Sequence, residues 1–178
     1  METIKTIDEL VQKLSLMKKD HSKVLDIMSL VEIPREDFER YFRWSDARYT
    51  RNVLARTEDF EVLLVCWEKG QISPIHDFNS QEAWIHPVVG KLREERFKIN
   101  IEDERLERVS NMILGDEEFS YMKQVAIHRY SNAYEGRSVS LNIYCRPVTE
   151  WRVYDEHTTD CAVLKPWITK DFHITVSS

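Results

Sequence analysis

Near the N-terminus, apolar residues recur every three or four positions, which is the spacing of amphipathic helices. Thr6 and Glu9 match a capping box, in which a threonine hydroxyl and a glutamate three residues later bind the free N–H groups of a first helical turn. We therefore predict a helix that begins after Thr6. The apolar positions of its buried face are Ile7, Leu10, Val11, Leu14 and Met17.

The same spacing predicts two further helices. One amphipathic run covers His21 to Val31. Another is expected to begin at Pro34, since proline suits the first position of a helix, and to run to about Phe42. Glu36 and Asp37 would place two acids in its first turn, where the helix dipole favours negative charge.

From Arg48 onward the pattern changes to short β-rich runs separated by polar turns, with weaker runs to the end of the chain. Many short strands at steady spacing favour an antiparallel barrel or sandwich. We predict one compact domain, with an N-terminal helical cap over residues 1–45 and a β-barrel over residues 46–178. The runs are Tyr49 to Arg56, Phe60 to Trp67, Ser73 to Phe78, Ala83 to Val89, Lys91 to Lys98, Arg105 to Leu114, Met122 to His128 and Ser138 to Arg146.

Composition and charge narrow the choice of partners. A chain of 178 residues with 42% hydrophobic residues suits a single domain. The net charge of -6 argues against nucleic acid or an anionic membrane surface as the main partner, because both require a basic face. With no apolar run near the roughly 20 residues of a membrane span and no signal-peptide core, we expect a cytoplasmic protein and a monomer. Three cysteines without metal-like spacing indicate reduced thiols.

The segment from Gly70 to Gly90 carries the clearest candidate chemistry. It contains a glycine, five residues, His76, an alternate position at 78, a short turn and a second strand that ends in glycine. This arrangement is similar to the first metal-binding motif of a cupin, a jelly-roll barrel, and His128 stands where the second motif supplies its histidine. Side chains two apart on a strand share a face, so position 78 would point inward with His76. His128 would come from a strand across the barrel.

Six separated blocks occur in the order and approximate spacing of one family within the cupins. On these blocks the chain resembles the cysteine dioxygenase family from about Tyr41 to Phe172, and it is similar to bacterial members. The blocks are Arg48-Tyr49-Thr50-Arg51-Asn52, Cys66-Trp67, Pro74-Ile75-His76-Asp77, Gly90-Lys91-Leu92-Arg93-Glu94, Ile127-His128-Arg129 and Ser140-Leu141-Asn142-Ile143-Tyr144.

The resemblance implies an all-β cupin barrel that holds a mononuclear non-haem iron(II) with three histidines. Such an enzyme adds both atoms of dioxygen to a thiol and yields a sulfinic acid. By motif position, His76 and His128 would be metal ligands. Imidazoles suit ferrous iron.

The resemblance also assigns residues to the substrate. Arg51 would clamp a substrate carboxylate, because a guanidinium matches a carboxylate with two parallel hydrogen bonds, and Tyr49 would flank it. Tyr144 would place its hydroxyl over the bound thiol and oxygen. Ser140 would begin a hydrogen-bond chain behind it.

Three residues depart from the family pattern. Phe78 replaces the second histidine and cannot bind a metal. Ala83 stands where animal members have a cysteine that is cross-linked to the active-site tyrosine. Asn142 replaces a histidine between the serine and the tyrosine; it can hydrogen-bond but cannot shuttle a proton.

Another group could take the place of the missing ligand. Glu82 is one candidate, because two histidines and one carboxylate form a known iron site, and His86 is another. The register argues against both, since Ala83 occupies the inward position and its neighbours then face outward. A bulge at Asn79 to Gln81 would reverse this assignment.

Each site residue also has an ordinary structural interpretation. A histidine can be a buried or rim residue, Arg51 can pair with an acid, and Tyr144 can be a core residue with its hydroxyl bonded.

The candidate residues predict two main functions. The first is a thiol dioxygenase that oxidises cysteine or a related small thiol carboxylate, with iron(II) bound weakly or absent. The second is a cupin without catalysis that keeps its pocket as a small-molecule binding or sensing module; a site rebuilt for another metal is a third possibility.

Overall fold

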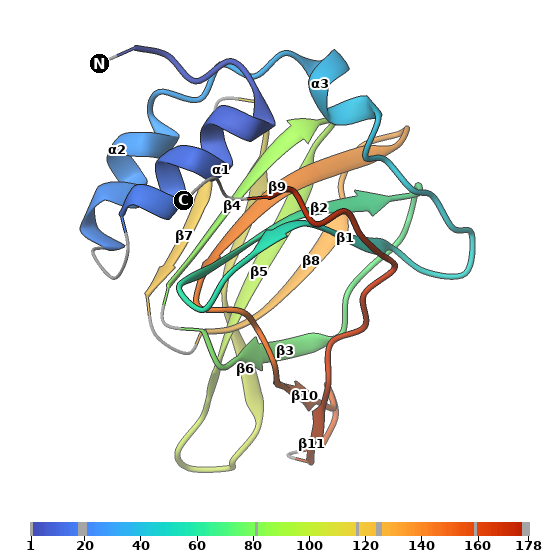
Figure 1. Cartoon of the computed structure of the whole chain (residues 1–178). Coiled ribbons are helices and arrows are strands. Elements are labelled where there is room, and N and C mark those ends of the chain that lie inside the picture. The colour runs from blue at the N-terminus through green and yellow to red at the C-terminus, as the bar shows by residue number, and fades with distance from the viewer. Residues whose placement is uncertain are drawn as a thin grey trace.

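Two β-sheets and a group of N-terminal helices make up the computed structural model of the protein (Figure 1). It describes residues 2–17, 21–80, 82–116, 118–123, 126–158 and 160–175. The helices are α1 (Ile7–Leu16), the short 3-10 helix η1 (His21–Lys23), α2 (Val24–Met28) and α3 (Arg35–Glu39).

The strands form two six-stranded sheets. The strands are β1 (Thr50–Arg56), β2 (Phe60–Trp67), β3 (Ile75–Phe78), β4 (Glu82–Val89), β5 (Leu92–Ile99), β6 (Leu106–Leu114), β7 (Ser120–Lys123), β8 (Ile127–Asn132), β9 (Ser138–Cys145), β10 (Trp151–Tyr154), β11 (Cys161–Leu164) and β12 (Lys170–Asp171). The first sheet has the order β12-β1-β2-β9-β4-β7 and the second has the order β11-β10-β3-β8-β5-β6. Neighbouring strands run antiparallel, except that β12 runs parallel to β1.

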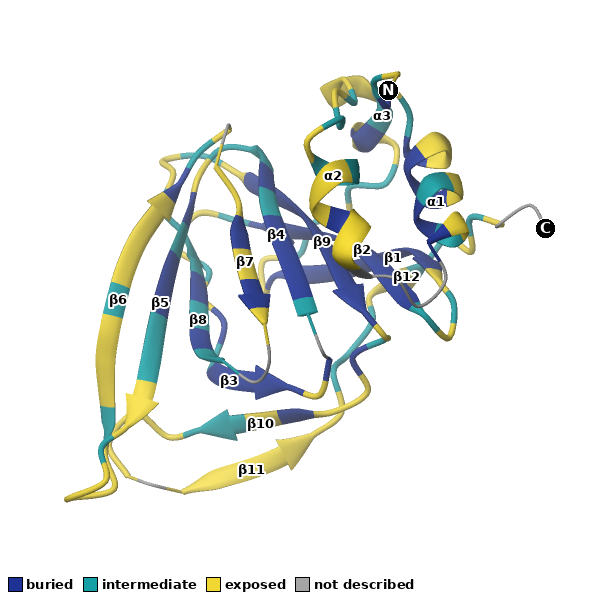
Figure 2. Cartoon of the chain, turned by 90° about the vertical axis from the view of Figure 1, so that its left-hand side faces the viewer, coloured by how far each residue is buried: buried dark blue, intermediate teal, exposed yellow. Residues whose placement is uncertain are grey.

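The central strands of the first sheet, β1, β2 and β9, are buried on both faces. In β2 every residue is buried. Leu63 and Val65 point into the barrel, whereas Val62 and Leu64 point toward the helices. A strand covered on both faces becomes a continuous hydrophobic run, which explains the sequence Phe60 to Trp67. By contrast, β6 and β11 are largely exposed (Figure 2).

The N-terminal helices cover the outer face of the first sheet. The capping box of α1 is present as predicted: the Thr6 hydroxyl accepts from the N–H of Glu9, whose carboxylate accepts from the N–H of Thr6. The apolar stripe of α1 packs in one cluster with side chains of β1, β2, β4 and β9. No helix in the described ranges is long and apolar enough to cross a membrane.

Some element boundaries differ from those predicted. The run Met122 to His128 was wrong as one strand: β7 and β8 lie in different sheets, and residues 124 and 125 are outside the described residues. The run His21 to Val31 contains η1 and α2, which ends at Met28. Pro34 is the N-cap of α3 rather than its first helical residue, and α3 ends at Glu39 instead of near Phe42.

We expect the packing of α1 to be essential for stability. Leu10 is fully buried in the cluster under the helices, so Leu10→Ala should lower the free energy of unfolding by about 2 to 5 kcal/mol. Leu16→Ala in the same helix is the matched control, because Leu16 is 80% exposed and should change stability by less than about 0.5 kcal/mol. Urea denaturation measures both. Equal effects would contradict this packing.

Candidate active site

Two histidines meet inside the barrel. His76 on β3 and His128 on β8 are direct cross-strand partners, and their ring centroids lie 4.4 Å apart at an interplanar angle of 54°. Opposed residues of antiparallel strands have Cβ atoms about 5 Å apart, so the pairing itself brings the rings together. The expectation that His128 would come from across the barrel was wrong, because β8 is the neighbour of β3 in the same sheet.

Backbone carbonyls fix the tautomer of both rings. His76 Nδ1 lies 2.9 Å from the Pro74 carbonyl oxygen, and His128 Nδ1 lies 2.7 Å from that of Ala126. A carbonyl oxygen only accepts, so each Nδ1 carries the proton and each Nε2 keeps a lone pair. Burial lowers the pKa of His76 well below its usual range, and burial also lowers the pKa of His128. Both imidazoles are therefore neutral at pH 7.

Phe78 occupies the inward position next to this pair. Its ring meets the His128 ring edge-on at 5.3 Å and the Tyr144 ring at 5.2 Å. Phe78 is 3% exposed and belongs to the barrel core. At this position the site presents a hydrocarbon wall instead of a third donor.

A hydrogen-bond chain runs along β9 toward the site. The Ser140 hydroxyl donates to Asn142 Oδ1 at 2.8 Å, and Asn142 Nδ2 donates to the Tyr144 hydroxyl at 3.2 Å. These residues are two apart and share the inward face of the strand. Ala83 on β4 is the direct cross-strand partner of Tyr144. The bonded Tyr144 hydroxyl accepts from the amide, so its own proton is available to another group.

Arg51 is a buried cation without an acidic partner. It is 4% exposed, and its Nε and Nη2 have no hydrogen-bond partner in the described part of the chain. Its guanidinium carbon lies 4.8 Å from the centre of the Trp151 ring, which in turn lies 4.7 Å from the His76 ring. Arg51 therefore lies close to the imidazole pair. Its unpaired nitrogens are suited to a carboxylate.

Aromatic side chains surround this guanidinium. Tyr49, which is 4% exposed, stacks on Trp67 at 4.3 Å and contacts Trp167 at 4.9 Å. Trp167 also meets Trp151 edge-on at 5.3 Å. Sequence reasoning did not single out Trp151 or Trp167, because both lie in the weakly patterned C-terminal segment. Trp151 reaches the site through the pairing of β10 with β3, and Trp167 lies in the segment between β11 and β12.

Asp77 anchors β3 from its outward face. Its carboxylate accepts from Arg152 Nε at 3.0 Å and from the Tyr154 hydroxyl at 2.7 Å, both on the neighbouring strand β10. Asp77 is 2% exposed. This contact holds β3 in the register that points His76 and Phe78 inward.

Glu82 and His86 lie on the other face of β4. Ala83 and Ile85 belong to the barrel interior, whereas Trp84 packs toward the helices. Glu82 and His86 line hollows beside α2 and β7, and His86 Nδ1 is 3.0 Å from the Glu118 carbonyl oxygen. The register predicted for β4 is the one observed; Gln81, within the turn considered for a bulge, is outside the described residues.

The donors present fit a divalent metal held by two imidazoles, and they do not fit a three-histidine centre. Metal-binding histidines usually donate their other N–H to a carbonyl or carboxylate, as His76 and His128 do. Because these hydrogen bonds run through Nδ1, the Nε2 lone pair of each ring is the one that would bind a metal. Within the same residues, no three histidine, cysteine or acidic side chains form a group that could hold a metal.

The fold has close counterparts among solved structures. A conserved protein with a double-stranded β-helix domain from Klebsiella pneumoniae matches with a TM-score of 0.55 at 14% identity, over 65% of this chain and 86% of that chain. A structure from Thermus thermophilus matches with a TM-score of 0.52 at 13% identity, over 62% of this chain and 94% of that chain. The fold of the protein is therefore a barrel of the double-stranded β-helix type.

Sequence comparison then gives the family. The model of cysteine dioxygenase type I matches residues 1–157. Human cysteine dioxygenase type 1 is 24% identical over 177 residues, which cover 95% of this chain and 86% of the relative, and the zebrafish protein is 24% identical over 164 residues, covering 86% and 81%. The chain belongs to the cysteine dioxygenase type I family, which confirms the resemblance and indicates a thiol dioxygenase-like protein at the family level.

We expect Asp77 to stabilise the strand that carries the site. In Asp77→Asn the shape is kept, but the charged hydrogen bonds to Arg152 and Tyr154 are weakened. The free energy of unfolding should fall by about 1 to 3 kcal/mol, because hydrogen bonds to a charged group are worth this much and Arg152 is itself half-exposed. Urea denaturation is the measurement. Glu150→Gln, an exposed acid just before β10, is the control, and equal stability of the two variants would contradict the anchoring role.

Proposed function

We propose that the protein is a thiol dioxygenase acting on a small thiol that carries a carboxylate, such as cysteine. The observation that carries this proposal is the buried guanidinium of Arg51, whose Nε and Nη2 find no hydrogen-bond partner among the described residues, beside two imidazoles whose hydrogen bonds run through Nδ1. A buried cation without a partner destabilises a fold, so a bound carboxylate is the natural complement. Family membership supports the same activity.

In this proposal His76 and His128 would hold iron(II) through Nε2. Iron(II), when bound, supplies the activation of dioxygen toward the thiol sulfur. Arg51 binds the substrate carboxylate through Nε and Nη2 and so orients the thiol toward the imidazoles. Trp151 covers the face of the guanidinium and keeps its hydrogen-bonding edge for the substrate.

The remaining residues act on protons and water. Tyr144 can donate its hydroxyl proton to an atom of the bound substrate, while Asn142 holds the hydroxyl in place. Asn142 has no titratable proton, so a proton relay through this position is excluded. Phe78, Tyr49 and Trp151 are nearly fully buried and exclude water from the site.

Oxygen uptake tests the activity and the role of Arg51. With anaerobically loaded iron(II), we expect uptake with cysteine or 3-mercaptopropionate, and Arg51→Met should raise KM for these acids by roughly 100-fold, which corresponds to about 2.7 kcal/mol. Cysteamine, which lacks the carboxylate, should be affected by less than about threefold. Arg48→Met, a change of an exposed cation nearby, is the control. Loaded protein that turns over no thiol would refute the proposed activity.

Replacing Phe78 by histidine tests whether His76, His128 and position 78 can bind one metal ion together. In Phe78→His, a third donor joins the inward face, and the affinity for iron(II) or cobalt(II) should rise by roughly 100-fold or more. Phe78→Leu keeps the site apolar and should leave the affinity unchanged. The affinity is measured by titrating the metal into the protein under anaerobic conditions in a calorimeter. This measurement does not depend on turnover. An unchanged affinity in Phe78→His would show that the imidazoles do not share a site with position 78.

Phe78 also favours a second candidate function, a binding or sensing module without catalysis. The substitution removes a donor and adds an apolar wall, while Arg51 keeps its carboxylate-binding edge. Protein that binds no metal but is thermally stabilised by cysteine would support this function, since a ligand of the native state raises the melting temperature.

A further inference from the structure

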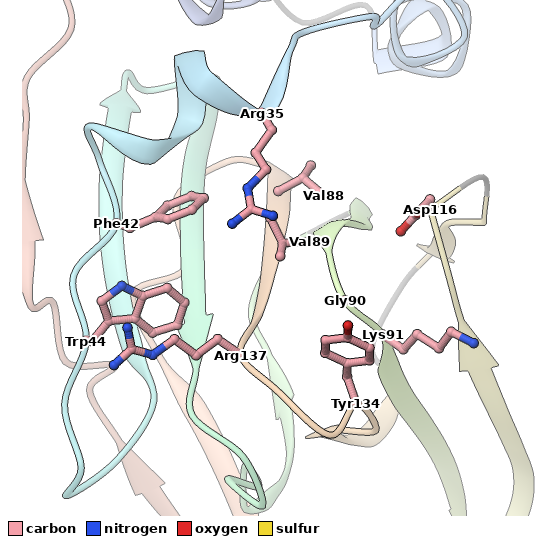
Figure 3. A pocket seen from close by; sticks show the side chains of 10 residues that line it. All are labelled: Arg35, Phe42, Trp44, Val88, Val89, Gly90, Lys91, Asp116, Tyr134 and Arg137. Carbon is pink, nitrogen blue, oxygen red and sulfur yellow. The ribbon is translucent and has the colours of Figure 1, made fainter.

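A second cavity lies outside the barrel, between the helices and the loops at one end of the strands. Its volume is about 640 Å³, within the range of small-molecule sites. None of the residues that line it belongs to the site of His76, His128 and Arg51. Figure 3 shows the lining side chains, which are Arg35, Phe42, Trp44, Val88, Val89, Gly90, Lys91, Asp116, Tyr134 and Arg137.

One wall of this cavity is aromatic and aliphatic. Phe42 and Trp44 meet edge-on at 5.7 Å, and Val88 and Val89 from the end of β4 face them across the opening (Figure 3). Arg137 stacks on Trp44 with its guanidinium carbon 4.5 Å from the ring, and its nitrogens bind Glu68 at 2.8 to 3.1 Å. Arg137 is therefore neutralised and forms part of the wall.

The polar part of the lining includes cationic groups that can still bind an anion. Arg35 reaches down from α3 between Phe42 and Val89, with its terminal nitrogens toward the opening (Figure 3). Within the described part of the chain only its Nε is bonded, to Glu39 at 2.8 Å, and both members of this pair are about half-exposed. Such an exposed ion pair contributes little, so it does not compete strongly with a ligand. Lys91 has no ion-pair partner for its ammonium group among the described residues.

Two cations that line the cavity keep N–H groups for an anion, in a chain whose net charge is -6. They are Arg35 and Lys91; the third lining cation, Arg137, is paired with Glu68, and Asp116 is the acid in the lining.

The floor of the cavity is tightly packed around Gly90. This residue has a φ of +69°, and a Cβ there would lie 2.5 Å from Ser138 Oγ and 3.1 Å from the Tyr134 ring. The hydroxyl of Tyr134 points into the cavity from this floor (Figure 3).

We propose that this cavity binds a small aryl carboxylate. The carboxylate accepts hydrogen bonds from the two terminal nitrogens of Arg35, whose planar fork matches it, and the flat ring extends from there into the open part of the cavity beside Phe42 and Trp44. Lys91 adds positive charge to the same end. The site is separate from the barrel interior and requires no metal.

Calorimetry on the full-length protein tests this site with 3-phenylpropionate as the probe. We expect saturable binding with a Kd below roughly 1 mM. The amide 3-phenylpropionamide, which lacks the charge, and propionate, which lacks the ring, should each bind at least about tenfold more weakly. No saturation by 3-phenylpropionate at roughly 10 mM, or equal binding of inorganic phosphate, would overturn the proposal.

Variants locate the bound probe. Arg35→Gln should weaken 3-phenylpropionate binding by about tenfold or more, whereas Arg40→Gln should leave it within about twofold. Arg40 is the matched control, because it is an exposed arginine at the other end of α3 that pairs with Asp37 and does not line the cavity. His76→Ala should also leave binding unchanged. Binding lost in His76→Ala, or equal in the two arginine variants, would place the probe elsewhere and refute the site.

Discussion

The register of β3 is the constraint on which the candidate active site depends. Side chains alternate along a strand, so His76 and Phe78 point inward only while Asp77 points outward. A slip of one residue would turn the Asp77 carboxylate into the barrel interior and turn the His76 imidazole out of it. Both neighbours of β3 oppose such a slip: β10 binds Asp77 through Arg152, and β8 places His128 opposite His76.

Phe78 has two opposite effects on the metal site proposed for His76 and His128. It leaves the inward face with two imidazole donors where the family pattern has three. Its ring also excludes water from the His128 imidazole, which it meets at 5.3 Å. Burial of this kind disfavours the charged form and keeps both histidines neutral, as a metal requires. The same residue thus weakens the site as a metal cage and preserves the protonation state of the ligands that remain.

Local patterns in the sequence predicted most of the fold. The apolar run Phe60 to Trp67, the capping box at Thr6 and the inward direction shared by His76 and Phe78 each depend on neighbours within a few residues, and each was found as expected. The run Met122 to His128 failed because it contains no glycine or proline to mark the break between two strands. The place of His128 beside His76 also depends on sheet topology, which local spacing does not specify.

The candidate site was less completely predictable for the same reason. The chain Ser140–Asn142–Tyr144 was expected from the family resemblance, and its three residues alternate along one strand, so no long-range pairing was needed to find it. The contact between Trp151 and Arg51 could not be predicted in this way, because Trp151 lies on β10 and Arg51 on β1, which belong to different sheets. A short strand with a weak pattern gave no signal that its first residue would reach the centre of the barrel.

The two arginines of the proposed sites differ in what their burial implies. Arg35 is exposed, and water can solvate its charge whether or not a ligand is present. Arg51 is 4% exposed, so its charge has lost most of its hydration. The Trp151 ring compensates part of this cost, because the face of an aromatic ring attracts a cation. A ring face lies above the guanidinium plane, however, and the N–H groups point within that plane. The in-plane Nε and Nη2 of Arg51 find no acceptor among the described residues, and this is why we propose that the acceptor is the carboxylate of a ligand.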